Sequence, residues 1–169
     1  YAAYQTNKYP ERKLAILSCM DTRIVELIYA ALGVKNGDVK MIRNAGAVVS
    51  HPWGSVMRSL LVAVLELRVE EIMVIAHFDC GMRGLTAQSM LDAAQARGIP
   101  ADRIETLRHA GIDLDSWFTG FDNVEQSVRH TVNMIRHHPL MPSNVVVHGL
   151  VIHPSTGKLT LIEKGARDE

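Results

Sequence analysis

The chain has few cysteines and no excess of charge of either sign. Only two of its 169 residues are cysteines, Cys19 and Cys80, which excludes the dense disulfide framework of small secreted domains and favours a reducing, cytoplasmic location. Eighteen basic residues balance eighteen acidic ones, so the basic footprint of a nucleic-acid-binding protein is missing. The longest apolar runs, such as residues 60–65 and 145–152, are shorter than the roughly 20 residues that cross a bilayer. These absences predict no nucleic-acid partner and no membrane partner.

The overall composition is that of an ordinary globular protein. Hydrophobic residues make up 47% of the chain and charged residues 21%, as in typical soluble domains. No change in composition divides the sequence, and its length suits one sizeable core. We therefore predict a single domain over residues 1–169.

Strand-like and helix-like patterns alternate along the first half of the chain. Residues 13–18, 38–42 and 71–76 are short apolar runs typical of buried strands. A helical pattern follows the first run and ends at Gly33, and a second, over residues 53–67, follows the next. This alternation predicts an α/β fold with a mostly parallel central sheet flanked by helices. The strand order is expected to be about 2-1-3-4-5.

The second half is expected to complete the sheet. Residues 85–121 predict two short helices around Gly98 and then a loop that carries Trp117 and Phe118. Asn123, with Gln126 three residues later, predicts the start of another helix. Two further strands are predicted, over residues 144–149 and 159–163. The Pro154-Ser155-Thr156-Gly157 turn between them indicates that the last strand is antiparallel.

Potential metal ligands follow two of the predicted strands. Cys19 follows the first strand, and His77 and Cys80 follow the third. Ligands of open α/β sheets bind beyond the carboxyl ends of strands where the strand order reverses, so neighbouring first and third strands would bring these residues together. Thiolate and imidazole favour zinc. Three protein ligands leave one position open, as in catalytic zinc sites.

An acidic residue and an arginine lie shortly after Cys19 in the sequence. Asp21 lies two residues after Cys19, and Arg23 lies two residues further. A guanidinium can bind a carboxylate through two parallel hydrogen bonds, and Asp21 held in this way could orient a zinc-bound hydroxide. Alternatively, Asp21 could bind zinc as the fourth ligand and close the site. Two thiolates and a neutral imidazole also cancel the charge of Zn²⁺, which suits a small neutral substrate.

Three motifs in this order resemble those of the β-class carbonic anhydrases, short branch: Cys19-x-Asp21-x-Arg23, Arg43-Asn44-Ala45-Gly46 and His77-x-x-Cys80-Gly81. The resemblance covers residues 13–84. It implies zinc held by Cys19, His77 and Cys80 and an Asp21–Arg23 pair. The implied reaction is the reversible hydration of carbon dioxide to bicarbonate by zinc-bound hydroxide. It further implies a homodimer or homotetramer.

Other interpretations of the same residues remain open. Similar short proteins hydrolyse carbon disulfide or carbonyl sulfide, and a closed site would make the chain a non-catalytic zinc- or bicarbonate-binding protein. Arg43 and Asn44 are expected to brace a loop, Gly46 to allow close backbone approach, and Asp79 and Arg83 to play local or surface roles. Any of the remaining histidines could carry protons, and sequence alone selects none of them: His51, His109, His130, His137, His138, His148 and His153.

Overall fold

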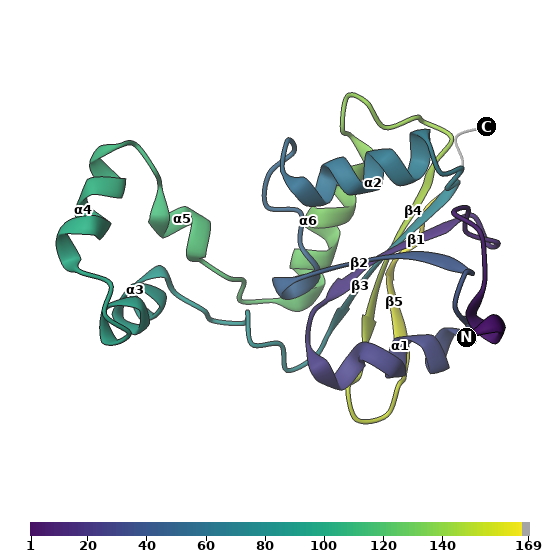
Figure 1. Cartoon of the computed structure of the whole chain (residues 1–169), viewed down its shortest axis with the longest axis horizontal. Helices are drawn as coiled ribbons and strands as arrows, with labels where there is room; N and C mark the ends of the chain where they lie inside the picture. Colours follow the sequence, from purple (N-terminus) through teal and green to yellow (C-terminus); the bar gives the residue numbers. More distant parts are fainter. Residues whose placement is uncertain (167–169) are drawn as a thin grey trace. The chain divides into compact units, whose positions relative to one another are not determined.

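The computed structural model describes residues 1–166 and contains one five-stranded sheet (Figure 1). The strand order is β2-β1-β3-β4-β5, with parallel pairing throughout except for the antiparallel pair of β4 and β5. The α/β fold, the strand order and the antiparallel last strand are thus confirmed. The strands are β1 (Leu14–Cys19), β2 (Val39–Asn44), β3 (Glu71–His77), β4 (Val146–Ile152) and β5 (Leu159–Glu163).

The centre of the sheet is apolar because helices cover its faces. All six residues of β1 are buried, and β3 is buried along most of its length. Such continuous apolar strands are typical of parallel sheets that are covered on both sides. Figure 1 shows α2 (Ser55–Leu65) and α6 (Val124–Arg136) on one face of the sheet and α1 (Val25–Leu32) on the other.

Helix α6 packs on β4 at a glycine. A Cβ built on Gly149 would lie 2.5 Å from the Val128 Cγ1 and 3.1 Å from the Val132 Cγ2. Val128 and Val132 are both buried and share one face of α6. The missing side chain at Gly149 therefore allows the helix to lie close against the strand.

The chain divides into two compact units, residues 1–80 with 124–169 and residues 81–123. The smaller unit contains α3 (Ala87–Ala96), α4 (Ala101–His109) and α5 (Leu114–Phe118). Its core consists of Leu91, Ile104 and Leu114, with Phe118 packed against them. The prediction of a loop carrying Trp117 and Phe118 was wrong. Asp113 accepts a hydrogen bond from the Ser116 N–H and starts a short helix, whose Leu114 joins this core.

Several element boundaries differ from the predicted ones by a few residues. The helix predicted over residues 53–67 begins at Ser55, after Pro52 and Gly54, and ends at Leu65. Strand β4 extends to Ile152, beyond the predicted end at Gly149. Helix ends fray and strand ends depend on pairing, so such shifts are expected.

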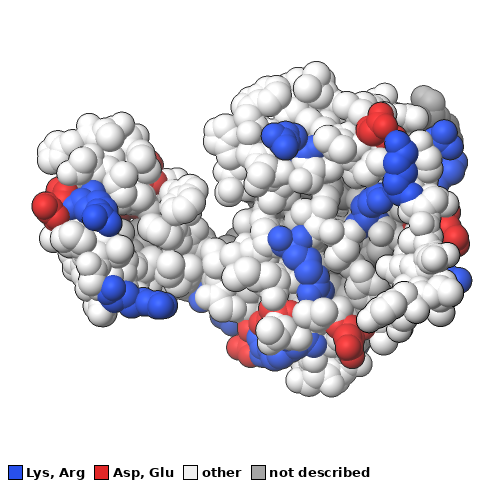
Figure 2. Space-filling model, in the orientation of Figure 1, with Lys and Arg blue, Asp and Glu red and all other residues white. Residues whose placement is uncertain are grey.

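Charged side chains are scattered over the face of the molecule that Figure 2 draws. Lysine and arginine side chains lie among acidic ones there rather than in one continuous stripe. Within residues 1–166, no helix combines the length and the apolar composition of a membrane span.

Candidate metal centre

Three potential ligands meet at the carboxyl ends of the parallel strands. Cys19 is the last residue of β1, His77 is the last residue of β3, and these strands are parallel neighbours. Cys80 follows after one turn, in which Asp79 has a φ of 55°. The ligand atoms of the three side chains lie within 4.8 Å of one another, and all three residues are buried. The topology thus brings the two cysteines and the histidine together, as the strand order predicts.

The imidazole of His77 has one nitrogen with no hydrogen-bond partner. Nδ1 donates to the main-chain oxygen of Phe78 at 2.8 Å, which fixes the ring. Nε2 is buried and has no hydrogen-bond partner among the described residues. An unpaired polar atom in a protein interior carries a free-energy cost, and it calls for an explanation such as an ion. With Nδ1 protonated, Nε2 offers a lone pair to a metal.

The two sulfur atoms are spaced as metal ligands would be. They lie 3.9 Å apart, and both cysteines are free. Two sulfurs at about 2.3 Å from a tetrahedral zinc would be separated by about 3.8 Å. The spacing and the soft donor set fit zinc.

The environment of Cys19 favours its thiolate. The pKa of this thiol lies well below its ordinary value, chiefly because of the interaction with the Cys80 sulfur. Burial opposes the shift, and His77 and the Gly46 N–H add to it. That N–H points at the Cys19 Sγ from 3.4 Å. For His77, burial disfavours the imidazolium, but Cys19 and the Phe78 carbonyl outweigh burial and raise the pKa of the imidazole. A metal would compete with that proton for Nε2.

The carboxylate of Asp21 lies beside the ligands and is bound by Arg23. Oδ1 accepts from the Arg23 main-chain N–H at 2.9 Å and from its Nε at 3.0 Å, and Oδ2 accepts from a terminal nitrogen at 2.9 Å. These hydrogen bonds lower the pKa of Asp21 to about 2. Its Oδ2 is 3.7 Å from the His77 Nε2. The carboxylate is therefore charged, oriented and close to the ligand set.

Asp79 is a partner of Arg23 that sequence reasoning missed. Its carboxylate accepts from the Arg23 Nη1 at 2.8 Å, and its main-chain oxygen accepts from Nη2 at 2.7 Å. The Arg23 guanidinium thus joins Asp21 to the turn that carries His77 and Cys80. A signal was present in the sequence, since Asp79 lies between two predicted ligands. Its partner, however, is 56 positions upstream.

The Arg43–Gly46 segment has the bracing role that the sequence predicts. Arg43 ends near α1, where its Nη2 donates to the Ile24 carbonyl at 3.1 Å. The amide of Asn44 bonds both main-chain groups of Val48, at 2.6 Å and 3.2 Å. Gly46 has a φ of 86°, which an L side chain would find strained.

Most of the other histidines take local roles. His138 is buried, bonds the Pro52 carbonyl through Nε2 at 3.0 Å and packs edge-on against Trp53. His148 pairs with Glu71 at 3.1 Å. His153 follows β4, and its ring centroid is 6.1 Å from that of Phe78, the residue after His77. No proton carrier is assigned by these contacts.

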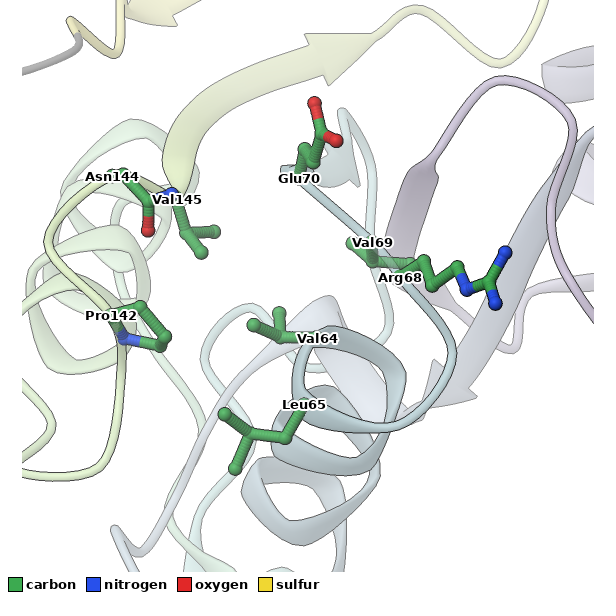
Figure 3. Close-up of a pocket in the computed structure, with 8 residues that line it drawn as sticks. All are labelled: Val64, Leu65, Arg68, Val69, Glu70, Pro142, Asn144 and Val145. Carbon is green, nitrogen blue, oxygen red and sulfur yellow. The ribbon is translucent and has the colours of Figure 1, made fainter.

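A cavity of about 290 Å³ lies near the amino ends of β3 and β4, at the opposite end of these strands from the metal centre (Figure 3). It is lined by residues that precede β3 and β4, among them Val69 and Val145. Its charged residues are engaged elsewhere, since Arg68 stacks over the Tyr9 ring at 4.3 Å and Glu70 pairs with Lys13 at 2.6 Å. This cavity is therefore separate from the candidate metal centre.

Comparison with known proteins identifies the family. The family model described as carbonic anhydrase matches residues 14–159, which include all the candidate ligands. The chain belongs to the β-carbonic anhydrase family. The solved β-carbonic anhydrase isoform I of Trichomonas vaginalis is 37% identical, with a TM-score of 0.89, over 96% of this chain and 88% of that one.

Curated relatives of this β-carbonic anhydrase family member carry two kinds of name. "Putative carbonic anhydrase YtiB" of Bacillus subtilis is 59% identical, over 98% of this chain and 88% of its own length. A carbon disulfide hydrolase of Acidithiobacillus thiooxidans is 29% identical, over 88% of this chain and 76% of its own length. Family membership thus leaves the substrate to be determined from chemistry.

Proposed function

We propose that this chain catalyses the reversible hydration of carbon dioxide to bicarbonate, with zinc held by Cys19, His77 and Cys80. The observation that carries the proposal is the buried Nε2 of His77, which has no hydrogen-bond partner in residues 1–166, beside two sulfurs that are 3.9 Å apart. Three protein ligands match the count of catalytic zinc sites. When bound, zinc supplies a water that loses a proton at about pH 7 and a Lewis acid for the substrate.

The ligands set the charge of the centre. Two thiolates and a neutral imidazole balance a divalent cation, so a neutral substrate meets little electrostatic penalty. Burial of all three ligands keeps competing water away from the sulfur atoms. The hydrogen bond from Nδ1 of His77 to Phe78 keeps Nε2 directed at the ligand group.

Asp21 acts as a hydrogen-bond acceptor that orients the attacking water. An ionised carboxylate only accepts, and the low pKa of Asp21 keeps it ionised at any physiological pH. Its Oδ2 lies 3.7 Å from the His77 Nε2, so it would be within reach of a water on a metal held by the three ligands. The hydrogen bonds from Arg23 would keep the carboxylate from binding that metal itself. The net reaction consumes one carbon dioxide and one water and yields bicarbonate and a proton.

Stopped-flow assays of zinc-loaded protein test this function. The wild type should hydrate carbon dioxide, and Asp21→Asn should lose most of that rate while it retains one zinc per chain. Asp92→Asn is the matched control, because Asp92 is exposed and its carboxylate accepts a hydrogen bond from the Gln88 side chain at 2.7 Å. Absence of carbon dioxide hydration at both about pH 7 and about pH 8.5 would overturn the proposal.

Hydrolysis of carbon disulfide or carbonyl sulfide is the second candidate. The 29% identity with a carbon disulfide hydrolase favours it, and the same nucleophile can attack either cumulated substrate. The same zinc-loaded preparation should be assayed with all three substrates. Turnover of a sulfur-containing substrate alone would replace the first proposal. Stoichiometric zinc without any turnover would instead indicate the non-catalytic zinc- or bicarbonate-binding protein.

We also propose a homodimer or homotetramer. Large apolar side chains stay exposed on the larger unit, including Trp53 at 65% and Leu65 at 61%, and such surface is often covered by a partner. Light scattering after size-exclusion chromatography measures the mass directly. A monomeric mass for the active protein would contradict this proposal. The cytoplasmic location and the single-domain organisation stay predictions.

A further inference from the structure

We infer that Asn44 is a positioning residue for the metal centre, because it holds the Gly46 N–H against the Cys19 sulfur. The inference rests on the proposed metal site. It assigns a role in tuning one ligand to a residue that touches no substrate. Three sets of hydrogen bonds carry the argument.

The first contact ties Asn44 to the segment that carries Cys19. Asn44 ends β2, and its register partner on β1 is Cys19 itself. Its main-chain oxygen accepts from the Met20 N–H at 2.8 Å. The backbone at Cys19 and directly after it is therefore fixed relative to Asn44.

The second set of contacts closes the loop that follows β2. The Asn44 Nδ2 donates to the Val48 carbonyl at 2.6 Å, and its Oδ1 accepts from the Val48 N–H at 3.2 Å. Both polar ends of one side chain thus bind one residue four positions away. Such a clamp restricts the three residues between them, of which Gly46 and Ala47 are buried.

The third contact depends on the loop conformation that the Asn44–Val48 hydrogen bonds hold. The Gly46 N–H donates to the Cys19 Sγ at 3.4 Å. Gly46 and Ala47 have φ values of 86° and 57°, and left-handed backbone is unfavourable for an alanine. Without the Asn44 amide, the loop would be free to relax from this conformation and withdraw the N–H from the sulfur.

The chemical consequence concerns the charge on the sulfur. A hydrogen bond to a thiolate withdraws electron density from it, so the metal keeps more of its positive charge. Groups that contact ligands from outside the coordination sphere commonly change metal affinity or activity by about 10- to 100-fold. Loss of the Gly46 hydrogen bond should leave the ligand set intact, reduce the positive charge that a bound metal keeps, and so lower the activity.

Cadmium-113 NMR tests the inference without an activity assay. In cadmium-loaded wild type, the Gly46 amide proton should show scalar coupling to the metal through the N–H···S hydrogen bond and the Cys19 sulfur. Asn44→Ala should lose that coupling while the cysteine Hβ couplings of Cys19 and Cys80 remain. Asn44→Asp retains an acceptor for the Val48 N–H, so it should retain part of the coupling.

The matched control is Asn36→Ala. Asn36 also donates to a main-chain carbonyl, that of Tyr4 at 2.8 Å, but it lies before the amino end of β2, whereas Asn44 lies at the carboxyl end. It should leave the Gly46 coupling unchanged. In zinc-loaded protein, Asn44→Ala should reduce kcat about 10-fold, and Asn36→Ala should not.

The outcomes separate this inference from the proposed function. Cadmium bound by both cysteines, with no coupling to Gly46 in the wild type, would overturn the role of Asn44 and leave the metal site standing. Full coupling in a folded Asn44→Ala variant would overturn it too. No cysteine coupling in the wild type would contradict the metal site itself. If Asn44→Ala fails to fold, Asn44→Asp decides: unchanged coupling and kcat would overturn the inference.

Discussion

Arg23 holds the Asp21 carboxylate by both of its oxygens, through one main-chain and two side-chain hydrogen bonds of 2.9 Å to 3.0 Å. The carboxylate is thereby kept 3.7 Å from the His77 nitrogen rather than in contact with it. This pairing distinguishes an open metal centre from one that Asp21 closes.

Replacement of Arg23 should release Asp21. Lysine carries a single point charge and cannot reproduce the planar fork, so Arg23→Lys should reduce kcat by about 10-fold and Arg23→Ala by about 100-fold. Zinc content should stay at one per chain, because Arg23 is not a ligand. Stopped-flow assays and metal analysis measure both quantities. A normal kcat in Arg23→Ala would show that Asp21 needs no such partner.

Asp79 should contribute less to kcat than Arg23 does. Its side chain is 83% exposed, and exposed ion pairs are worth about 0 to 1 kcal/mol. Asp79→Asn is a suitable variant, because asparagine tolerates the left-handed conformation at this position. A fall in kcat of no more than about 5-fold is expected. The matched control is Glu66→Gln, which removes the exposed Lys8–Glu66 pair. Equal effects of the two variants would argue against a role for Asp79.

Loss of one sulfur should weaken zinc binding. Cys80→Ser substitutes a hydroxyl, which does not ionise readily, for a thiolate ligand. Competition with a zinc-binding dye should show an affinity lower by at least about 10-fold. Ser18→Ala serves as the control, since the Ser18 hydroxyl is buried next to Cys19 but bonds the Ile75 carbonyl. Unchanged zinc affinity in Cys80→Ser would exclude Cys80 from the ligand set.

The Asp21–Arg23 pair should stabilise the metal-free protein only above acidic pH. The folded pKa of Asp21, about 2, is below the value of about 3.9 in an unfolded chain. The stabilisation is therefore complete above about pH 5 and is lost as pH falls through about 4 toward 2. Denaturant unfolding of wild type and Asp21→Asn should differ at neutral pH and converge in acid. A difference that is constant with pH would contradict the low pKa.

Addition of a methyl group at Gly149 should disturb the contact between α6 and β4. The added Cβ would lie 2.5 Å from the Val128 Cγ1, and overpacking of this kind costs about 1 to 3 kcal/mol. The double variant Gly149→Ala with Val128→Ala removes the obstructing methyl. Its loss of unfolding free energy should be smaller than the sum of the single losses. Additive losses would show that the two positions do not compete for space.

The candidate ligands could be predicted from sequence because each follows an apolar strand. Once Cys19 and His77 are placed at the ends of neighbouring parallel strands, their proximity follows from strand order alone. The partner of Arg23 could not be predicted in the same way. Asp79 reaches Arg23 only because Asp79 itself adopts the left-handed conformation and turns the chain between His77 and Cys80. Nothing in the local sequence requires an aspartate to adopt that conformation.

The helix at Leu114–Phe118 was missed for a related reason. Five residues are too few for periodicity to distinguish a helix from a loop. Its stability comes from the contact of Leu114 and Phe118 with Leu91 and Ile104, which lie in separate helices. Long-range packing of this kind leaves little signal in a short window.

A crystal structure of the zinc-loaded protein at about pH 8 tests the central claim most directly, because bound solvent should be ionised under these conditions. The account predicts zinc on the Cys19 and Cys80 sulfurs and the His77 Nε2, with solvent as the fourth ligand and Asp21 still bound to Arg23. An Asp21 oxygen on zinc, or zinc held by other residues, would contradict it.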